Sequence, residues 1–120
     1  MLQLDNFLEA LPDSFLEDGF SLSLRWCDVP ETGYMVSYPA YEQVLESPTI
    51  LDIVDYVQEN VEFIYGLPHA FVGGWMDAET GKYYLDISQN IQDKAKALQV
   101  AAERKQLAIY DVASGVSIYL

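Results

Sequence analysis

Four acidic residues, Asp52, Asp55, Glu59 and Glu62, follow one another at spacings of three, four and three. Residues three or four apart lie on one face of an α-helix, so this spacing predicts a continuous row of carboxylates. Neighbouring carboxylates would stand about 4.5 to 6 Å apart along the helix axis, which is close to the scale of phosphate spacing along a nucleic-acid strand. The row is suited to imitating a phosphate backbone, although outward-facing charge is also ordinary for an amphipathic helix.

Three further residues belong to this predicted partner-binding surface. Tyr56 lies within the acidic row, and tyrosine supplies rigid contact area with a polar tip at protein interfaces. Strands also favour aromatic residues, so the nine tyrosines of the chain fit an ordinary fold as well. Glu42 and Glu46 precede the helix and extend the surface if the fold brings them to the same side.

The other reactive residues form no recognisable catalytic or metal-binding motif. Cys27 and His69 are the only cysteine and histidine, and neither lies in a local motif for a nucleophile and its base. The stretch DAETGK at residues 77–82 lacks the regular series of oxygen ligands of a calcium loop. We therefore predict no catalytic residue, no metal site and no cofactor.

Hydrophobic spacing predicts the elements that position these residues. Period 3.6 predicts helices over 4–11, 48–66 and 93–106, with Ser47 and Asp93 as N-caps and with Ala95, Leu98 and Ala102 facing the core in the last helix. Alternation and turn residues predict three hairpins, which pair 20–26 with 33–41, 70–76 with 83–88 and 107–112 with 116–120. In 20–26 the inward residues are Phe20, Leu22, Leu24 and Trp26. The expected fold is a single α+β domain over 1–120, a mainly antiparallel sheet built from hairpins with about three helices packed on it.

Charge divides the chain unevenly. Residues 1–80 hold fifteen acids and one base, Arg25, for a charge of −14, whereas residues 81–120 hold five bases and four acids, for +1. We accordingly distinguish an acidic part, 1–66, from a near-neutral hairpin–helix–hairpin scaffold, 67–120. Excess acid disfavours direct binding to nucleic acid or to an anionic membrane. The single cysteine and the absence of a basic, then apolar leader predict a cytoplasmic location.

Residues 73–112 carry a W-x-D-x-x-T-G hairpin from Trp75 to Gly81, a YLDIS strand, an alanine-rich helix and an AIYD strand. This stretch resembles modules of small uncharacterised proteins of phages and mobile elements. The resemblance implies an anti-defence role and transfers no functional residue.

Three classes of function remain open from the residues. The leading hypothesis is a non-catalytic inhibitor that occupies a basic nucleic-acid-binding surface of a partner protein, as a DNA mimic of the anti-CRISPR or anti-restriction type. The alternative is a structural or accessory domain, or a homodimer subunit, whose acidity serves solubility. A small hydrolase that uses Cys27 or a carboxylate pair is the third class.

Overall fold

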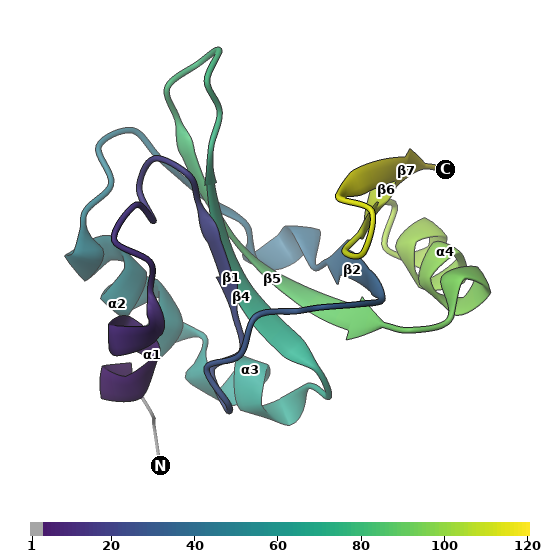
Figure 1. Ribbon diagram of the computed structural model, residues 1–120, viewed down its shortest axis with the longest axis horizontal. Coiled ribbons are helices and arrows are strands. Elements are labelled where there is room, and N and C mark those ends of the chain that lie inside the picture. Colours follow the sequence, from purple (N-terminus) through teal and green to yellow (C-terminus); the bar gives the residue numbers. More distant parts are fainter. Residues whose placement is uncertain (1–3) are drawn as a thin grey trace.

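The computed structural model describes residues 4–120, which form four α-helices, one 3-10 helix and seven strands (Figure 1). The helices are α1 (Leu4–Ala10), the 3-10 helix η1 (Pro39–Tyr41), α2 (Ile50–Glu59), α3 (Val61–Gly66) and α4 (Lys94–Glu103). The strands are β1 (Phe20–Leu22), β2 (Tyr34–Ser37), β3 (Gln43–Leu45), β4 (Ala70–Met76), β5 (Tyr83–Ile91), β6 (Ala108–Asp111) and β7 (Val116–Tyr119). The predicted α+β class is confirmed.

All seven strands belong to one antiparallel sheet; six of them follow the order β1-β4-β5-β2-β6-β7, and β3 pairs with β5 outside this order. The central strand is β5, which pairs with β4 along one side and with both β2 and β3 along the other. Between β2 and β3 the chain leaves the sheet to form η1, because Pro39 has no N–H to donate to the ladder. The hairpins β4–β5 and β6–β7 are confirmed.

The predicted hairpin between 20–26 and 33–41 is wrong, because β1 pairs with β4 while β2 pairs with β5 and β6. Strand β1 ends at Leu22, since Ser23 closes a tight turn. Its Oγ accepts from the N–H of Trp26 at 3.0 Å, and its carbonyl accepts from the N–H of Cys27 at 2.7 Å. The turn places Trp26 outside the core, with 72% of its surface exposed.

The predicted helix over 48–66 is two helices, which meet at Asn60. The backbone of Asn60 leaves the helical region (φ −112°, ψ 11°), and its side-chain amide donates to the carbonyl of Tyr56 at 2.8 Å. Asparagine competes in this way for helical carbonyls and favours a break. The N-cap of α2 is Thr49 rather than Ser47.

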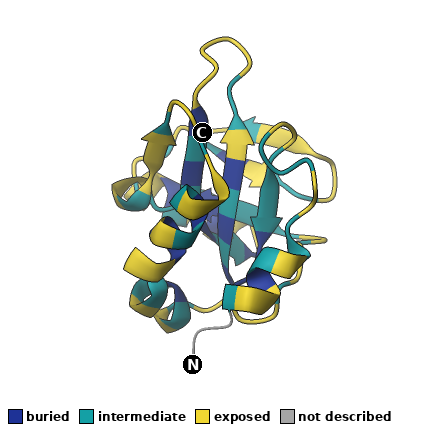
Figure 2. Ribbon diagram, turned by 90° about the vertical axis from the view of Figure 1, so that its left-hand side faces the viewer, coloured by how far each residue is buried: buried dark blue, intermediate teal, exposed yellow. Residues whose placement is uncertain are grey.

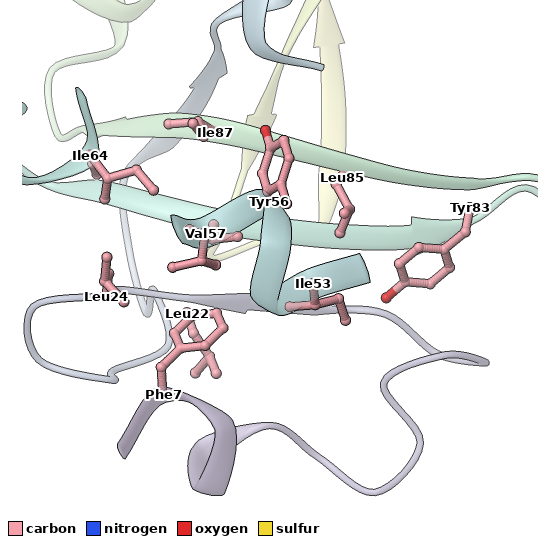
Figure 3. Close-up of a cluster of buried hydrophobic side chains, with 12 residues drawn as sticks. Phe7, Leu22, Leu24, Ile53, Tyr56, Val57, Ile64, Tyr83, Leu85 and Ile87 are labelled. Carbon is pink, nitrogen blue, oxygen red and sulfur yellow. The ribbon is translucent and has the colours of Figure 1, made fainter. Parts of the chain in front are cut away.

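Helices cover one face of the sheet, where two clusters of buried side chains form the core (Figure 2). In the larger cluster Ile53 and Val57 of α2 pack against Leu85 and Ile87 of β5, and Phe7 of α1 closes the far side (Figure 3). The smaller cluster joins α4 to β2 and β6, and its buried residues are Val36, Ile91, Ala97, Ala101 and Ile109. Within residues 4–120 the opposite face of the sheet carries no helix.

Candidate partner-binding surface

The acidic residues of α2 and α3 reach solvent on the outer side of the molecule. Asp55, Glu59 and Glu62 are exposed, as are Glu42 and Glu46. Segment 39–42 is held against both helices, because the ring of Tyr41 stacks on Phe63 of α3 with 3.9 Å between centroids. We call the exposed carboxylates of the two helices, Asp55, Glu59 and Glu62, the acidic helix surface. Glu42 and Glu46 flank β3, which pairs with β5, and the charge of Glu42 acts on Asp86 of β5, so these two acids belong to the edge of the sheet and not to the helices.

Asp52 has a structural role that its position in the acidic row does not indicate. Its Oδ2 accepts from the N–H of Thr49 at 2.8 Å and from the Thr49 hydroxyl at 3.2 Å, which forms a capping box at the start of α2. Its carboxylate also lies at the positive end of the helix dipole. Asp52 is thus partly committed to holding α2 and is less available to a partner than the prediction assumed.

Replacing Asp52 therefore tests its contribution to the stability of the fold, apart from any contribution to partner binding. We expect Asp52→Ala to lower the free energy of unfolding by about 1 kcal/mol, the usual cost of losing a cap. Urea denaturation measures this loss, and Asp55→Ala is the matched control because Asp55 is exposed on the same helix. Equal effects of the two substitutions would show that the capping box does not stabilise α2.

Tyr56 lies in the core, so its predicted contact with a partner is wrong. Only 2% of its surface is exposed, and its hydroxyl donates to the carbonyl of Tyr41 at 2.6 Å. Burial, with the charges of Asp86 and Glu42, raises the pKa of this hydroxyl above its ordinary value. The reason is helical phase: Tyr56 is three residues after Ile53, on the buried side of α2. It anchors η1 to α2.

Both arginines bind neutral groups. Arg25 donates to the carbonyl of Tyr65 at 3.1 Å. Arg104 donates to the hydroxyl of Tyr38 and to Oε1 of Gln89, each at 2.8 Å, and its guanidinium lies 3.7 Å from the centroid of the Tyr38 ring. All four lysines lie within residues 81–120. The acidic helix surface therefore keeps an uncompensated negative field.

The helix-free face contains a hollow of about 640 Å³. By the strand order of the sheet, residues of β1 and β4 line one side of it, residues of β6 and β7 line the other, and β5 and β2 lie between them. Asp86 of β5 lines the hollow and is largely buried. Its Oδ2 accepts from the hydroxyl of Ser37 at 3.3 Å, and a side chain at Gly73 would collide with its Oδ1.

Burial raises the pKa of Asp86 to about 6, the Ser37 hydrogen bond acts in the opposite direction, and the charge of Glu42 adds a smaller upward effect. A carboxylate with a raised pKa inside a hollow is a recognised mark of a functional site. Sequence reasoning missed Asp86, although one signal was present: in YYLDISQN the polar residues Asp86 and Ser88 alternate with the apolar Leu85 and Ile87, which indicates a polar sheet face.

A second groove, of about 490 Å³, contains His69 together with Arg25, Asp28 and Glu31. Cys27 does not line it, and burial together with the charge of Asp28 raises the pKa of the Cys27 thiol, which disfavours the reactive thiolate. Among residues 4–120, no three His, Cys, Asp or Glu side chains are grouped to hold a metal. In the same part of the chain no helix has the length and apolarity needed to cross a bilayer.

Comparison with protein families, curated proteins and solved structures found no match to this chain. The resemblance of residues 73–112 to phage modules therefore stays a prediction. Function is inferred from the two surfaces described above.

Proposed function

We propose that this protein is a non-catalytic inhibitor that occupies the basic, nucleic-acid-binding surface of another protein. The acidic helix surface takes the place of nucleic-acid phosphates, as in DNA mimics of the anti-CRISPR or anti-restriction type. The observation that carries the proposal is the uncompensated charge: α2 and α3 expose the carboxylates of Asp55, Glu59 and Glu62, while both arginines are engaged with neutral groups.

The mechanism is competition for lysine and arginine side chains. A partner that binds nucleic acid presents a basic groove, and the protein, with a net charge of −13, is drawn to it over long range. Once docked, carboxylates pair with the partner's cations and exclude the nucleic acid. The near-neutral residues 67–120 supply β4 and β5, whose buried side chains share the larger core cluster with those of α2 and α3.

Salt dependence tests this mechanism. The protein is immobilised and used to capture its partner from a lysate of the cell in which it acts, and affinity is then measured from about 50 to about 200 mM salt. We expect the affinity to fall by a factor of about 100 or more across this range, because several charge pairs are screened together. An affinity that stays constant over the same range contradicts the mechanism.

A second candidate function, a subunit of a homodimer, is favoured by the C-terminal hairpin. Strand β7 forms an edge of the sheet, and an unprotected edge is a template for pairing with another strand. Val116, Tyr119 and Leu120 expose 56%, 76% and 53% of their surface. Residues 81–120 carry a charge of only +1, so a second copy meets less repulsion here than at the acidic part.

Proline at Ser117 tests the homodimer. The N–H of Leu120 donates to the carbonyl of Leu107, so these two residues form a hydrogen-bonded pair at the end of the β6–β7 ladder. Hydrogen-bonded and non-hydrogen-bonded pairs alternate along an antiparallel ladder, and the pair of Tyr110 with Ser117 is a non-hydrogen-bonded one. The N–H of Ser117 therefore points away from β6. Ser117→Pro removes that outward donor without breaking the β6–β7 ladder. Light scattering should give a dimer for the wild type and for the control Ser117→Ala, and a monomer for Ser117→Pro. A wild-type monomer at every concentration refutes the homodimer.

A further inference from the structure

The hollow on the helix-free face matches a positively charged ligand. Asp86 and Asp18 line it, and none of its lining residues, all within the described part of the chain, is Lys, Arg or His. The serines Ser37 and Ser88 add hydroxyl groups, whose oxygen atoms lie 3.1 Å apart. These groups accept hydrogen bonds, so they favour a ligand that donates them.

Two half-exposed aromatic rings lie on opposite sides of the hollow. Trp75 of β4 and Tyr110 of β6 expose 46% and 45% of their surface. The ring of Trp75 stacks on Tyr84 at 4.4 Å between centroids and 10° between planes, which fixes its orientation. Aromatic faces attract cations, and Trp does so most strongly. Trp75 is on the strand next to Asp86, whereas Tyr110 is two strands away, so the hollow combines a carboxylate with one nearby aromatic surface for a flat cation.

The surroundings of Asp86 favour a guanidinium over an ammonium group. Among the described hydrogen bonds, this carboxylate accepts only one, from Ser37, and that bond is long at 3.3 Å. A guanidinium is planar, donates several N–H groups in a fixed fork to a carboxylate, and stacks on aromatic rings. An ammonium is a more strongly hydrated point charge and gains less on entering a largely buried site.

We propose that the hollow binds an arginine side chain, with its guanidinium placed against Asp86 and beside the ring of Trp75, which lies one strand away on β4. This inference rests on the proposed function in one respect, which is that the arginine comes from a segment of the basic partner. Since the hollow lies on the sheet face opposite the helices, it gives the partner a second point of attachment. It also explains why a largely buried carboxylate is kept at the centre of the sheet.

A short peptide tests the site without the partner. The peptide Gly-Arg-Gly amide is titrated into the isotope-labelled protein, and chemical shifts of the Trp75 indole and of the Ser37 and Asp86 amides are followed by NMR. We expect saturable shifts at millimolar peptide. The same peptide with citrulline, the neutral counterpart of arginine, should bind about tenfold or more weakly, and a lysine peptide should fall between the two.

Two variants locate the binding. Asp86→Asn should abolish the shifts, whereas the control Glu103→Gln, which removes one exposed charge from α4, should leave them unchanged. Trp75→Leu should weaken binding by about tenfold, because the cation–π contact is lost. Binding by Asp86→Asn equal to that of the wild type, or equal binding of the arginine and citrulline peptides, overturns the proposal.

The pH dependence of peptide binding gives an independent test of the site. The titratable groups around Asp86 are Glu42 beside η1, Asp18 before β1, Tyr56 of α2 and Tyr110 of β6, whereas Ser37 and Gly73 on the adjacent strands carry no charge. Peptide affinity should fall as the pH drops below about 6, where Asp86 takes up a proton. Neutralising Asp55, Glu59 and Glu62 should not change peptide binding, so failure of this site and failure of the proposed function are distinguishable.

Discussion

Neutralising the three carboxylates of the acidic helix surface, by Asp55→Asn, Glu59→Gln and Glu62→Gln together, is expected to weaken partner binding by a factor of about 100 to 1,000. Each lost charge pair at such an interface contributes about 1 to 1.5 kcal/mol, and a factor of ten corresponds to about 1.4 kcal/mol. The substitutions relieve like-charge repulsion on the helices, so the variant should fold at least as well as the wild type. Titration calorimetry with the captured partner measures the change.

The control removes the same number of charges elsewhere. Glu31→Gln, Glu79→Gln and Glu103→Gln alter three exposed acids in a loop, at the tip of the β4–β5 turn and on α4. We expect a loss of less than about tenfold, which reflects weaker long-range attraction alone. Equal losses for the two triple variants would mean that net charge, and not the acidic helix surface, determines binding.

Asp86→Asn is expected to stabilise the protein on the order of 2 to 3 kcal/mol at pH 8. The folded protein holds the proton of Asp86 up to a pH of about 6, whereas the unfolded chain releases it near the ordinary pKa of 3.8. Between these values the folded state binds more protons, so the Asp86 contribution to stability falls as the pH rises and reaches its most unfavourable value above about pH 6. The difference in pKa corresponds to on the order of 3 kcal/mol.

Urea denaturation at pH 8 and at pH 4 measures this effect. Asparagine has no charge to desolvate, so the advantage of Asp86→Asn should be present at pH 8 and should shrink to nearly zero at about pH 4 and below. Glu103→Gln serves as the control and should show little difference at either pH, since Glu103 is exposed. A variant that is less stable than the wild type at pH 8 would show that the ionised carboxylate stabilises the fold.

Local sequence signals predicted the second half of the sheet well. The turn residues in DAETGK and ASG join strands that are neighbours in both sequence and space, so the β4–β5 and β6–β7 pairs follow from short-range chemistry. The partner of β1 could not be predicted in this way. Phe20 pairs with Gly74, more than fifty residues further along the chain, and the packing of β1 against β4 decides that contact.

The core face of α4 was predicted only in part, because Leu98 packs against the smaller cluster as expected but Ala95 and Ala102 do not. The buried residues are Ala97 and Ala101, whereas Ala95 and Ala102 are exposed. Alanines are spread around the whole helix, so apolar periodicity is weak there and does not determine the phase. The actual phase brings Arg104 over the ring of Tyr38, a contact between segments far apart in the sequence.

The sequence identified acidic residues of the candidate surface but did not identify the separate role of each predicted residue. Charge spacing identified Asp55, Glu59 and Glu62, all of which reach solvent. It could not separate Asp52, which caps α2, from the exposed carboxylates, nor place Tyr56 on the buried side of the helix. Asp86 was missed because its importance depends on burial, which arises only when β4, β5 and β2 come together.

The most direct test of the proposed function is competition between this protein and duplex DNA for the captured partner. DNA binding to the partner is measured by fluorescence anisotropy at several fixed concentrations of the protein. We predict that the apparent Kd for DNA rises in proportion to the protein concentration and that sedimentation detects no complex that contains all three molecules. A stable ternary complex, or a Kd for DNA that does not change, would contradict the claim that the acidic helix surface takes the place of nucleic acid.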